Sequence, residues 1–344
     1  MDRLELQRRP ARDATREYAL LLTQRAAEAC VRLHDPADVE ALHDFRVGVR
    51  RLRTFLTAYR ATLDAGPKAL AGLKRLAKST NEPRDLEVGL VWTRREREGV
   101  PARQRSGVDR WIERMHEQTL AAYAAVRASV PSGWAAVESR LRRRFSFAAE
   151  LMPAAESFGQ ISAVLVRSCA DGLESGLAGI ASIEDVEPAH DARIRAKRLR
   201  YLIEPFRGAV PRAKSVVRTL RELQDLLGDL NDVHVILPRL RDAACSAAAD
   251  RARRLFEAGL DPASGGAALR AARVRDGSAG LLALARIAVE RRQALFSTAR
   301  ERFLAGKADS LLVDVRSVAD ALAASRRAPL RLVQSPEIAP AEGE

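Results

Sequence analysis

The sequence has only three cysteines and no long apolar run. Cys30, Cys169 and Cys245 are odd in number and widely spaced, so they indicate neither a disulfide framework nor a metal-binding pattern, and they fit a reducing compartment. No stretch approaches the roughly 20 apolar residues of a membrane-spanning helix. The charged N-terminal segment also lacks the apolar run of a signal peptide. We therefore expect a cytoplasmic protein with no membrane segment.

Aromatic residues are also scarce, at 5% of the chain. Because proteins bind single-stranded nucleic acids by stacking bases on exposed aromatic rings, this scarcity argues against nucleic-acid binding without excluding it. The sequence has no P-loop, no histidines clustered at metal-ligand spacing and no glycine-rich turn that would hold phosphate. We therefore predict no catalytic residues, no metal and no cofactor.

Positive charge is what the sequence has in excess. Its 344 residues include 58 lysines and arginines against 45 acidic residues, which gives a net charge of +13. The length fits one large domain or two ordinary ones. A charge of this size implies an anionic partner, which could be a nucleic acid, an acidic lipid or a phosphate polymer.

Much of this charge lies in a segment that occurs twice. Residues 41–60, ALHDFRVGVRRLRTFLTAYR, align without a gap with residues 188–207, PAHDARIRAKRLRYLIEPFR, at an offset of 147. The polar matches include His43 with His190, Arg46 with Arg193, Arg50 with Lys197, Arg53 with Arg200 and Arg60 with Arg207. The match extends to Asp85, which meets Asp232. A repeat at one fixed offset indicates an internal duplication.

Both copies have the three- and four-residue apolar spacing of a helix. At about 100° per residue, the basic residues of each copy lie within roughly 60° on either side of Arg46 or Arg193, beside the apolar stripe. The alternative is an ordinary solvated helix face. However, like charges four residues apart destabilise a helix, and solvated faces usually mix signs. A positive row that occurs twice therefore predicts a polyanion that neutralises it.

The fold class predicted by the sequence is all-α. The apolar periodicity and the prolines predict helices at about 13–33, 38–63, 67–79, 83–98, 105–129 and 133–149, and then at 157–180, 188–208, 211–227, 229–259, 278–305 and 308–325. Asp13 and Asp38 are candidate caps of the first two helices. These helices predict two bundles, 12–150 and 157–325, related by approximate two-fold symmetry around a basic cleft. We expect a loop at 261–266 and a disordered tail at 326–344.

The repeated pattern H-D-x-R-x-x-x-(R/K)-R-L-R, each time with an aspartate at the same distance downstream, resembles the CHAD family, the conserved histidine α-helical domain. The resemblance covers about residues 12–325. It implies two helical bundles that bind inorganic polyphosphate in a basic cleft, and an association with polyphosphate granules. The E-x-E-x-K motif of the CYTH domain, which precedes some family members, is missing, so we expect a stand-alone CHAD protein.

The resemblance also implies which residues bind polyphosphate, namely the two rows with the neighbouring cations in support. These residues are His43, Arg46, Arg50, Arg53, Arg60, Lys74, Lys78, His190, Arg193, Lys197, Arg200, Arg207, Lys214, Arg218 and Arg221. Arginine binds phosphate oxygens with two parallel hydrogen bonds, and lysine supplies a point charge. The two histidines could contact phosphate or hydrogen-bond locally, beside Asp44 and Asp191.

Binding of polyphosphate without catalysis is the function that these features favour. The alternatives are a nonspecific nucleic-acid-binding helical protein, a phosphate-transferring enzyme and a helical adaptor. Arg51 and Arg198 point away from the rows, and we expect them to form ion pairs with the repeated acids Asp85 and Asp232. Asp229 with Asp232 could bind Mg²⁺, although a helix cap is the simpler role for an aspartate there. The sequence leaves the oligomeric state open.

Overall fold

The structure is a computed structural model that describes residues 6–146, 156–260 and 277–325. The predicted loop at 261–266 and the tail from residue 326 lie outside these ranges. Within them every regular element is a helix, and the only strand-like feature is a single bridge between Pro10 and Ser157. The prediction of an all-α fold is confirmed.

The helices of the first half end before residue 147. They are η1 (Leu6–Arg8), α1 (Ala11–Arg32), α2 (Ala41–Ala58), α3 (Pro67–Ser79), α4 (Asn81–Glu96), η2 (Arg97–Gly99), η3 (Ala102–Gln104) and α5 (Arg105–Ser146). The second half contains α6 (Phe158–Ala178), α7 (Val186–Ile203), η4 (Glu204–Phe206), α8 (Ala213–Leu260), α10 (Ser278–Arg302) and α11 (Asp309–Ala323). α1 and α6 begin 147 residues apart, which is the offset of the basic segments, but the two-fold symmetry of the halves stays a prediction.

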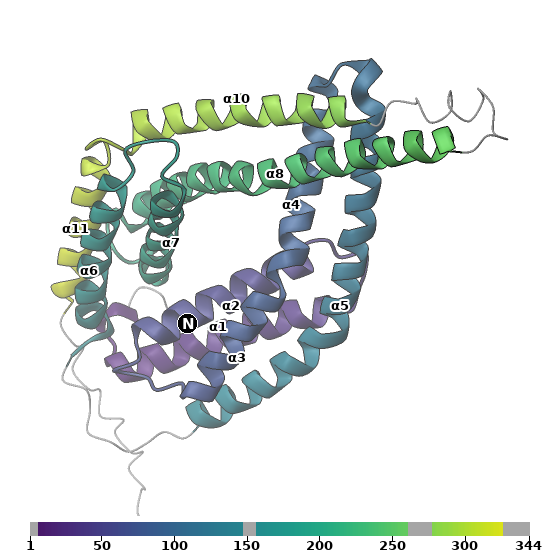
Figure 1. Ribbon diagram of the computed structural model, residues 1–344. Helices are drawn as coiled ribbons and strands as arrows, with labels where there is room; N and C mark the ends of the chain where they lie inside the picture. Colours follow the sequence, from purple (N-terminus) through teal and green to yellow (C-terminus); the bar gives the residue numbers. More distant parts are fainter. Residues whose placement is uncertain (1–5, 147–155, 261–276, 326–344) are drawn as a thin grey trace, which may run out of the picture.

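Two predicted breaks do not occur. The segments predicted at 105–129 and 133–149 form the single helix α5 with Pro131 inside it, and those at 211–227 and 229–259 form α8 with Gly228 and Pro238 inside it. A proline in a helix removes one hydrogen bond and bends the helix, and a glycine costs about 1 kcal/mol, so neither has to end a helix that packs well. α5 changes direction along its length (Figure 1).

Where the second half has one helix, the first half has a break at Thr80 between α3 and α4. Pro83 explains this difference. In an uninterrupted helix its ring would collide with the carbonyl of Ser79, four residues earlier. Leu230 occupies the matching position in α8 and carries no such restriction. As a result α4 leaves α3 at an angle, whereas α8 stays continuous.

The two predicted aspartate caps are wrong. Asp13 lies inside the first turn of α1, which begins at Ala11. α2 begins at Ala41, and Asp38 instead accepts a hydrogen bond from the backbone N–H of Glu40 at 3.1 Å and pairs with Arg32 at 2.7 Å. In both cases the helix begins two or three residues away from the aspartate, so neither aspartate occupies the N-cap position.

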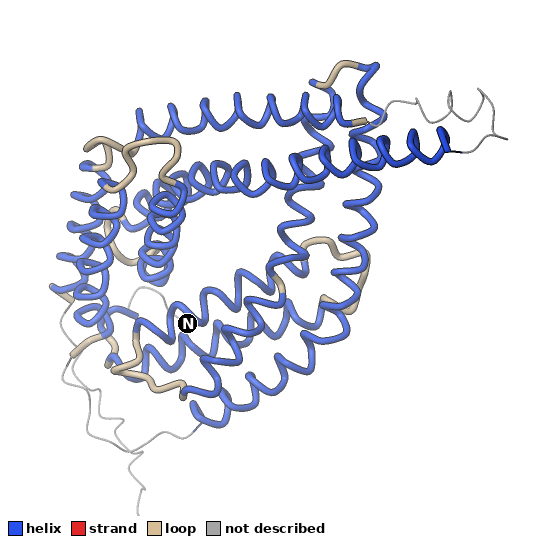
Figure 2. Tube along the Cα trace, in the orientation of Figure 1, coloured by secondary structure: helices blue, strands red, loops and turns tan. Residues whose placement is uncertain are grey.

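The helices are arranged in a ring, with α1, α2 and α3 along one side and α8 and α10 along the opposite side (Figure 1). Figure 2 shows the same view coloured by secondary structure. α1 packs on α2 and α5, and α7 packs on α6 and α8. The halves contact each other through α1 with α6, α2 with α7, α4 with α8 and α5 with α10. α2 and α7, which carry the two basic rows, therefore touch directly.

One hydrophobic core runs through both halves. At its centre Phe158 of α6 packs between Tyr59, which follows α2, and Phe206 of η4, with ring centroids 5.3 Å and 5.0 Å away. The buried hydroxyl of Tyr59 is 2.7 Å from that of Ser162. These contacts fix the end of α2 against the second half, so the two rows are held at one relative position.

Candidate functional site

The basic row of α2 borders the core because the apolar stripe beside it is buried. Leu52, Phe55 and Leu56 are at most 2% exposed. The helix therefore cannot rotate its cations freely into water. In α7, Leu199 and Leu202 are buried in the same way. Packing of the two stripes thus positions the basic side chains of both helices near their contact.

Lys197 of α7 is the clearest sign that the rows meet. Its side chain is half-buried, and its pKa is lowered to about 7. Burial is the largest cause, followed by the positive charges of Arg193, Arg50, Arg200 and Arg46, in that order. Two of these four arginines come from α2. The structure therefore gathers cations from both halves around one lysine.

Arg50 of α2 is in the same situation. Burial lowers its pKa, and the charges of Arg193 and Arg53 add to this, while Tyr201 and Asp85 act in the opposite direction. Neither Arg50 nor Lys197 has a hydrogen bond or ion pair with any residue in the described ranges. Half-buried cations without a bonded counter-charge are unfavourable, because burial removes water and no hydrogen bond replaces it.

Two other arginines of the rows, Arg46 and Arg200, are buried and form hydrogen bonds or ion pairs with neighbouring elements. The guanidinium of Arg46 is 7% exposed and donates to the carbonyl and, at 2.9 Å, to the hydroxyl of Thr80. Arg200 is 8% exposed, donates to Gln224 at 3.1 Å and pairs with Glu204 at 2.5 Å. Arg46 therefore stabilises the break between α3 and α4, and Arg200 joins α7 to α8 and η4.

Arg193 lies against the backbone of α8 at Gly228. A Cβ at that position would be 3.1 Å from both Nε and one terminal nitrogen of the arginine. The glycine thus permits this close approach, although the sequence suggested only a helix break there. Nε of Arg193 is buried and has no hydrogen-bond partner in the part of the chain that the structure describes.

The two histidines differ in their surroundings. His190 is exposed, and its Nδ1 lies 3.1 Å from the side-chain oxygen of Asn231 in α8. His43 is half-buried on α2. The expected local partner of His43, Asp44, pairs with Arg32 of α1 at 2.6 Å. Contact of His43 and His190 with phosphate stays a prediction.

The outlying cations of the predicted site are all exposed. Arg60 and Arg207 follow α2 and α7 in the chain, and the others lie on α3 and α8. This group consists of Arg60, Lys74, Lys78, Arg207, Lys214, Arg218 and Arg221. The structure therefore brings together Arg46, Arg50, Arg53, Arg193, Lys197 and Arg200, while the role of the outlying group stays a prediction.

The predicted ion pair between Arg51 and Asp85 does not form. Arg51 pairs with Glu204 at 3.3 Å, and its guanidinium lies 5.4 Å from the ring centroid of Tyr201. Glu204 also binds Arg200, so one carboxylate connects an arginine of each half. The sequence could not show this, because Glu204 lies in η4 and has no acidic match at the offset.

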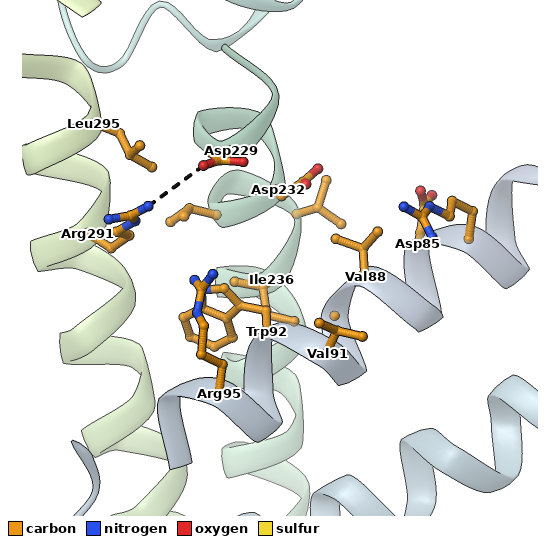
Figure 3. A pocket seen from close by; sticks show the side chains of 14 residues that line it. Asp85, Val88, Val91, Trp92, Arg95, Asp229, Asp232, Ile236, Arg291 and Leu295 are labelled. Carbon is orange, nitrogen blue, oxygen red and sulfur yellow. Dashed lines mark ion pairs between the residues drawn. The ribbon is translucent and has the colours of Figure 1, made fainter. Parts of the chain in front are cut away.

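Asp85 and Asp232 line a pocket of about 280 Å³ between α4, α8 and α10 (Figure 3). Burial raises the pKa of Asp232, and the positive charge of Arg193 partly offsets this rise. Asp229 is 3.7 Å from Arg291 of α10. Asp229 lies inside α8, so the prediction that it caps a helix is wrong. These acids thus border the basic rows on the side of α4 and α8.

Among the described residues, no three or more histidine, cysteine, aspartate or glutamate side chains are grouped so that they could hold a metal ion. No helix in the described ranges is both long and apolar enough to cross a membrane. What the rows offer chemically is a concentration of charged hydrogen-bond donors.

Comparisons with known proteins bear on this site. The CHAD domain family model matches residues 18–241. The crystal structure of the CHAD domain from the plant Ricinus communis is similar, with 19% identity, a TM-score of 0.59, and 89% of this chain and 92% of that chain covered. PptA from Streptomyces chartreusis is also 19% identical, with a TM-score of 0.50 over 85% of this chain and 99% of that chain. No curated protein sequence is significantly similar. The match includes both basic segments.

Proposed function

The chain belongs to the CHAD domain family, and from that premise we propose that it binds inorganic polyphosphate between α2 and α7 without catalysing a reaction. Polyphosphate is the ligand that the family resemblance implies. The proposed contacts are those of the basic rows, with Arg50, Arg53, Arg193 and Lys197 at the centre. Arg46 and Arg200 are bonded to Thr80 and Gln224 and so attach α2 and α7 to neighbouring elements.

The observation that carries the proposal is the group of positive charges around Lys197, a residue that has no bonded counter-charge. Its pKa of about 7 reflects burial together with four arginines from both halves. A chain of phosphates would supply the counter-charge that Arg50 and Lys197 lack. Because each phosphate unit carries charge but no base, recognition needs only rigidly held donors. Helices packed on a common core provide this rigidity.

Nucleic acid is the second candidate, and the aromatic residue at the site argues against it. Tyr201 lies beside the rows but is only 7% exposed, with the guanidinium of Arg200 4.8 Å from its ring centroid. A buried ring covered by an arginine cannot stack on a base. The family resemblance further suggests a cytoplasmic protein associated with polyphosphate granules, which we include in the proposal.

The proposal is tested by comparing polyanions at matched charge. We expect long-chain polyphosphate to bind more tightly than single- or double-stranded DNA at every salt concentration. Four central cations on a flexible strand predict that log K falls with log salt at a slope of about −3. Fluorescence anisotropy with labelled competitors measures both quantities. Equal affinity for all three polyanions would reduce the interaction to unspecific charge attraction.

Lys197 predicts a pH dependence of binding. With a pKa of about 7 in the free protein, this lysine must take up a proton to bind a polyanion above pH 7. Affinity should therefore fall by up to tenfold per pH unit between about pH 7.5 and 9. Lys197→Arg, which keeps the charge at every pH, should remove most of this slope. An unchanged slope in that variant would place the titrating group elsewhere.

The free protein should respond to pH in the opposite sense. Lysine in an unfolded chain has a pKa of about 10.4, above that of Lys197 in the folded protein, so the unfolded chain binds more protons in between. The contribution of Lys197 to the free energy of unfolding therefore rises with pH from about 7 to 10. Thermal unfolding of the wild type and Lys197→Arg, without ligand, measures this difference.

A further inference from the structure

We propose a second site for condensed phosphate in a basic cavity at the junction of α1, α3 and α5. The cavity measures about 840 Å³, and none of the row residues lines it. We call it the distal basic cavity. Among the described residues, its charged lining consists of Arg12, Arg16, Lys68, Arg140, Arg143 and Arg144, with Asp64 as the one carboxylate. The inference rests on the proposed function for the identity of the ligand.

The charge of the distal basic cavity is largely uncompensated. Asp64 is already engaged, because its carboxylate pairs with Arg144 and accepts the backbone N–H of Gly66 at 2.8 Å. Arg12, Lys68 and Arg143 have no side-chain hydrogen bond or ion pair with any residue in the described ranges. Among the described residues, six cations thus face one carboxylate, which is already paired. Cations converging on a concave surface focus a positive potential there and attract anions.

The cavity is held in shape by contacts between its elements. Arg16 of α1 donates to the carbonyl of Phe145 near the end of α5 at 3.2 Å. Arg144 of α5 donates to the carbonyl of Asp64 at 2.8 Å. Gly66, with φ of 76°, turns the chain sharply into α3, and a Cβ there would lie 3.3 Å from the guanidinium of Arg144. The three elements that carry the cations are therefore held together at this cavity.

The N-terminal turn of α3 also faces this cavity through Gly66, Lys68 and Ala69. Its N-cap residue provides no side-chain hydrogen bond. Unbonded N–H groups and the positive end of the helix dipole favour an anion at this place. This adds to the side-chain charge, which alone defines the site.

The matching positions of the second half lack three of these cations. At the offset of 147, Arg12 corresponds to Gly159, Arg16 to Ala163 and Lys68 to Ser215. The matching positions lie on α6 and α8, and none of the three carries a charge. The cations of the distal basic cavity are therefore an addition to the first half, which a ligand would explain.

Two phosphate sites on one chain would have a consequence for long polyphosphate. One molecule could hold two segments of a polymer, or two polymers, at once. The second contact would then be favoured by the high local concentration of phosphate around the first. Such bridging is a physical route by which the protein would remain on a dense phosphate phase.

The test is the stoichiometry of inorganic tripolyphosphate, a ligand too short to reach between sites, measured by titration calorimetry at low salt. The distal variant carries Arg12→Gln, Lys68→Ser and Arg143→Gln, and the row variant carries Arg50→Glu and Lys197→Glu. We expect two bound ligands for the wild type, one for each variant and none for the combination. Equal unfolding temperatures of the wild type and the distal variant show that the fold is intact.

The outcomes separate this inference from the proposed function. If the distal variant binds as much tripolyphosphate as the wild type, the distal site does not exist. If the row variant loses all binding, the distal site is likewise refuted while the proposed function stands. If the row variant keeps one ligand that the distal substitutions remove, the distal site is established independently of the rows. Orthophosphate at the same concentration should compete weakly, because it offers a single phosphate to several donors.

Discussion

Replacing both Arg50 and Lys197 with glutamate is expected to weaken polyphosphate binding by at least a hundredfold. Each charge-assisted hydrogen bond contributes about 1.5–3 kcal/mol, so loss of two already corresponds to about 3 kcal/mol or more, and each 1.4 kcal/mol is tenfold. The new carboxylates add repulsion at the place where the arginines of both halves converge. Binding isotherms at one fixed salt concentration measure the effect.

The matched control makes the same two changes from a positive to a negative side chain at positions away from the rows. Arg114 of α5 and Arg254 of α8 are exposed, and their side chains form no hydrogen bond or ion pair with any described residue. Arg114→Glu with Arg254→Glu should lower affinity only a few-fold, through net charge. Because Arg50 and Lys197 also lack partners, the row variant should fold normally. Equal losses in the two double variants would mean that the rows have no special role.

Phe158→Ala is expected to lower the free energy of unfolding by about 3–5 kcal/mol. Phe158 is fully buried, and its ring packs on Phe55 and Tyr59 of the first half as well as on Phe206 of the second. Removing it leaves a cavity in the core that both halves share. Urea unfolding followed by circular dichroism measures the loss, and we expect one transition that moves as a whole.

Phe256 provides the comparison for this substitution. It is 68% exposed on α8, and Phe256→Ala should change the free energy of unfolding by less than about 0.5 kcal/mol. A result in which Phe158→Ala shifts only one of two separate transitions would show that the halves unfold independently. In that case the relative position of α2 and α7 would not be fixed by the core.

Local signals in the sequence predicted most of the helices. α3 has the predicted bounds, 67–79, because Pro67 begins it and its apolar spacing is regular. The merged helices α5 and α8 were not predicted, since the cost of Pro131 or Gly228 inside a helix depends on packing that lies elsewhere. The break at Thr80 follows from Pro83, whereas α8 continues past Leu230. Apolar spacing and prolines in the sequence thus placed the helical segments, whereas packing decided which neighbouring segments join into one helix.

The individual roles within the basic rows could not be predicted from spacing. Arg46 and Arg50 are one turn apart and look alike in the sequence. Yet Arg46 is bonded to Thr80, 34 residues away, whereas Arg50 has no partner in the described ranges. Arg51 likewise forms an ion pair with Glu204, and not with its expected partner Asp85. Such assignments depend on contacts between distant segments, which no helical wheel contains.

The most direct measurement is a crystal structure of the chain with an oligophosphate of defined length. The account predicts phosphate oxygens within hydrogen-bond distance of Arg50 and Lys197, so that one ligand contacts both α2 and α7. Arg46 and Arg200 should keep their bonds to Thr80 and Gln224 in that complex. Phosphate bound only at exposed cations, with Arg50 and Lys197 unoccupied, would contradict the proposed site.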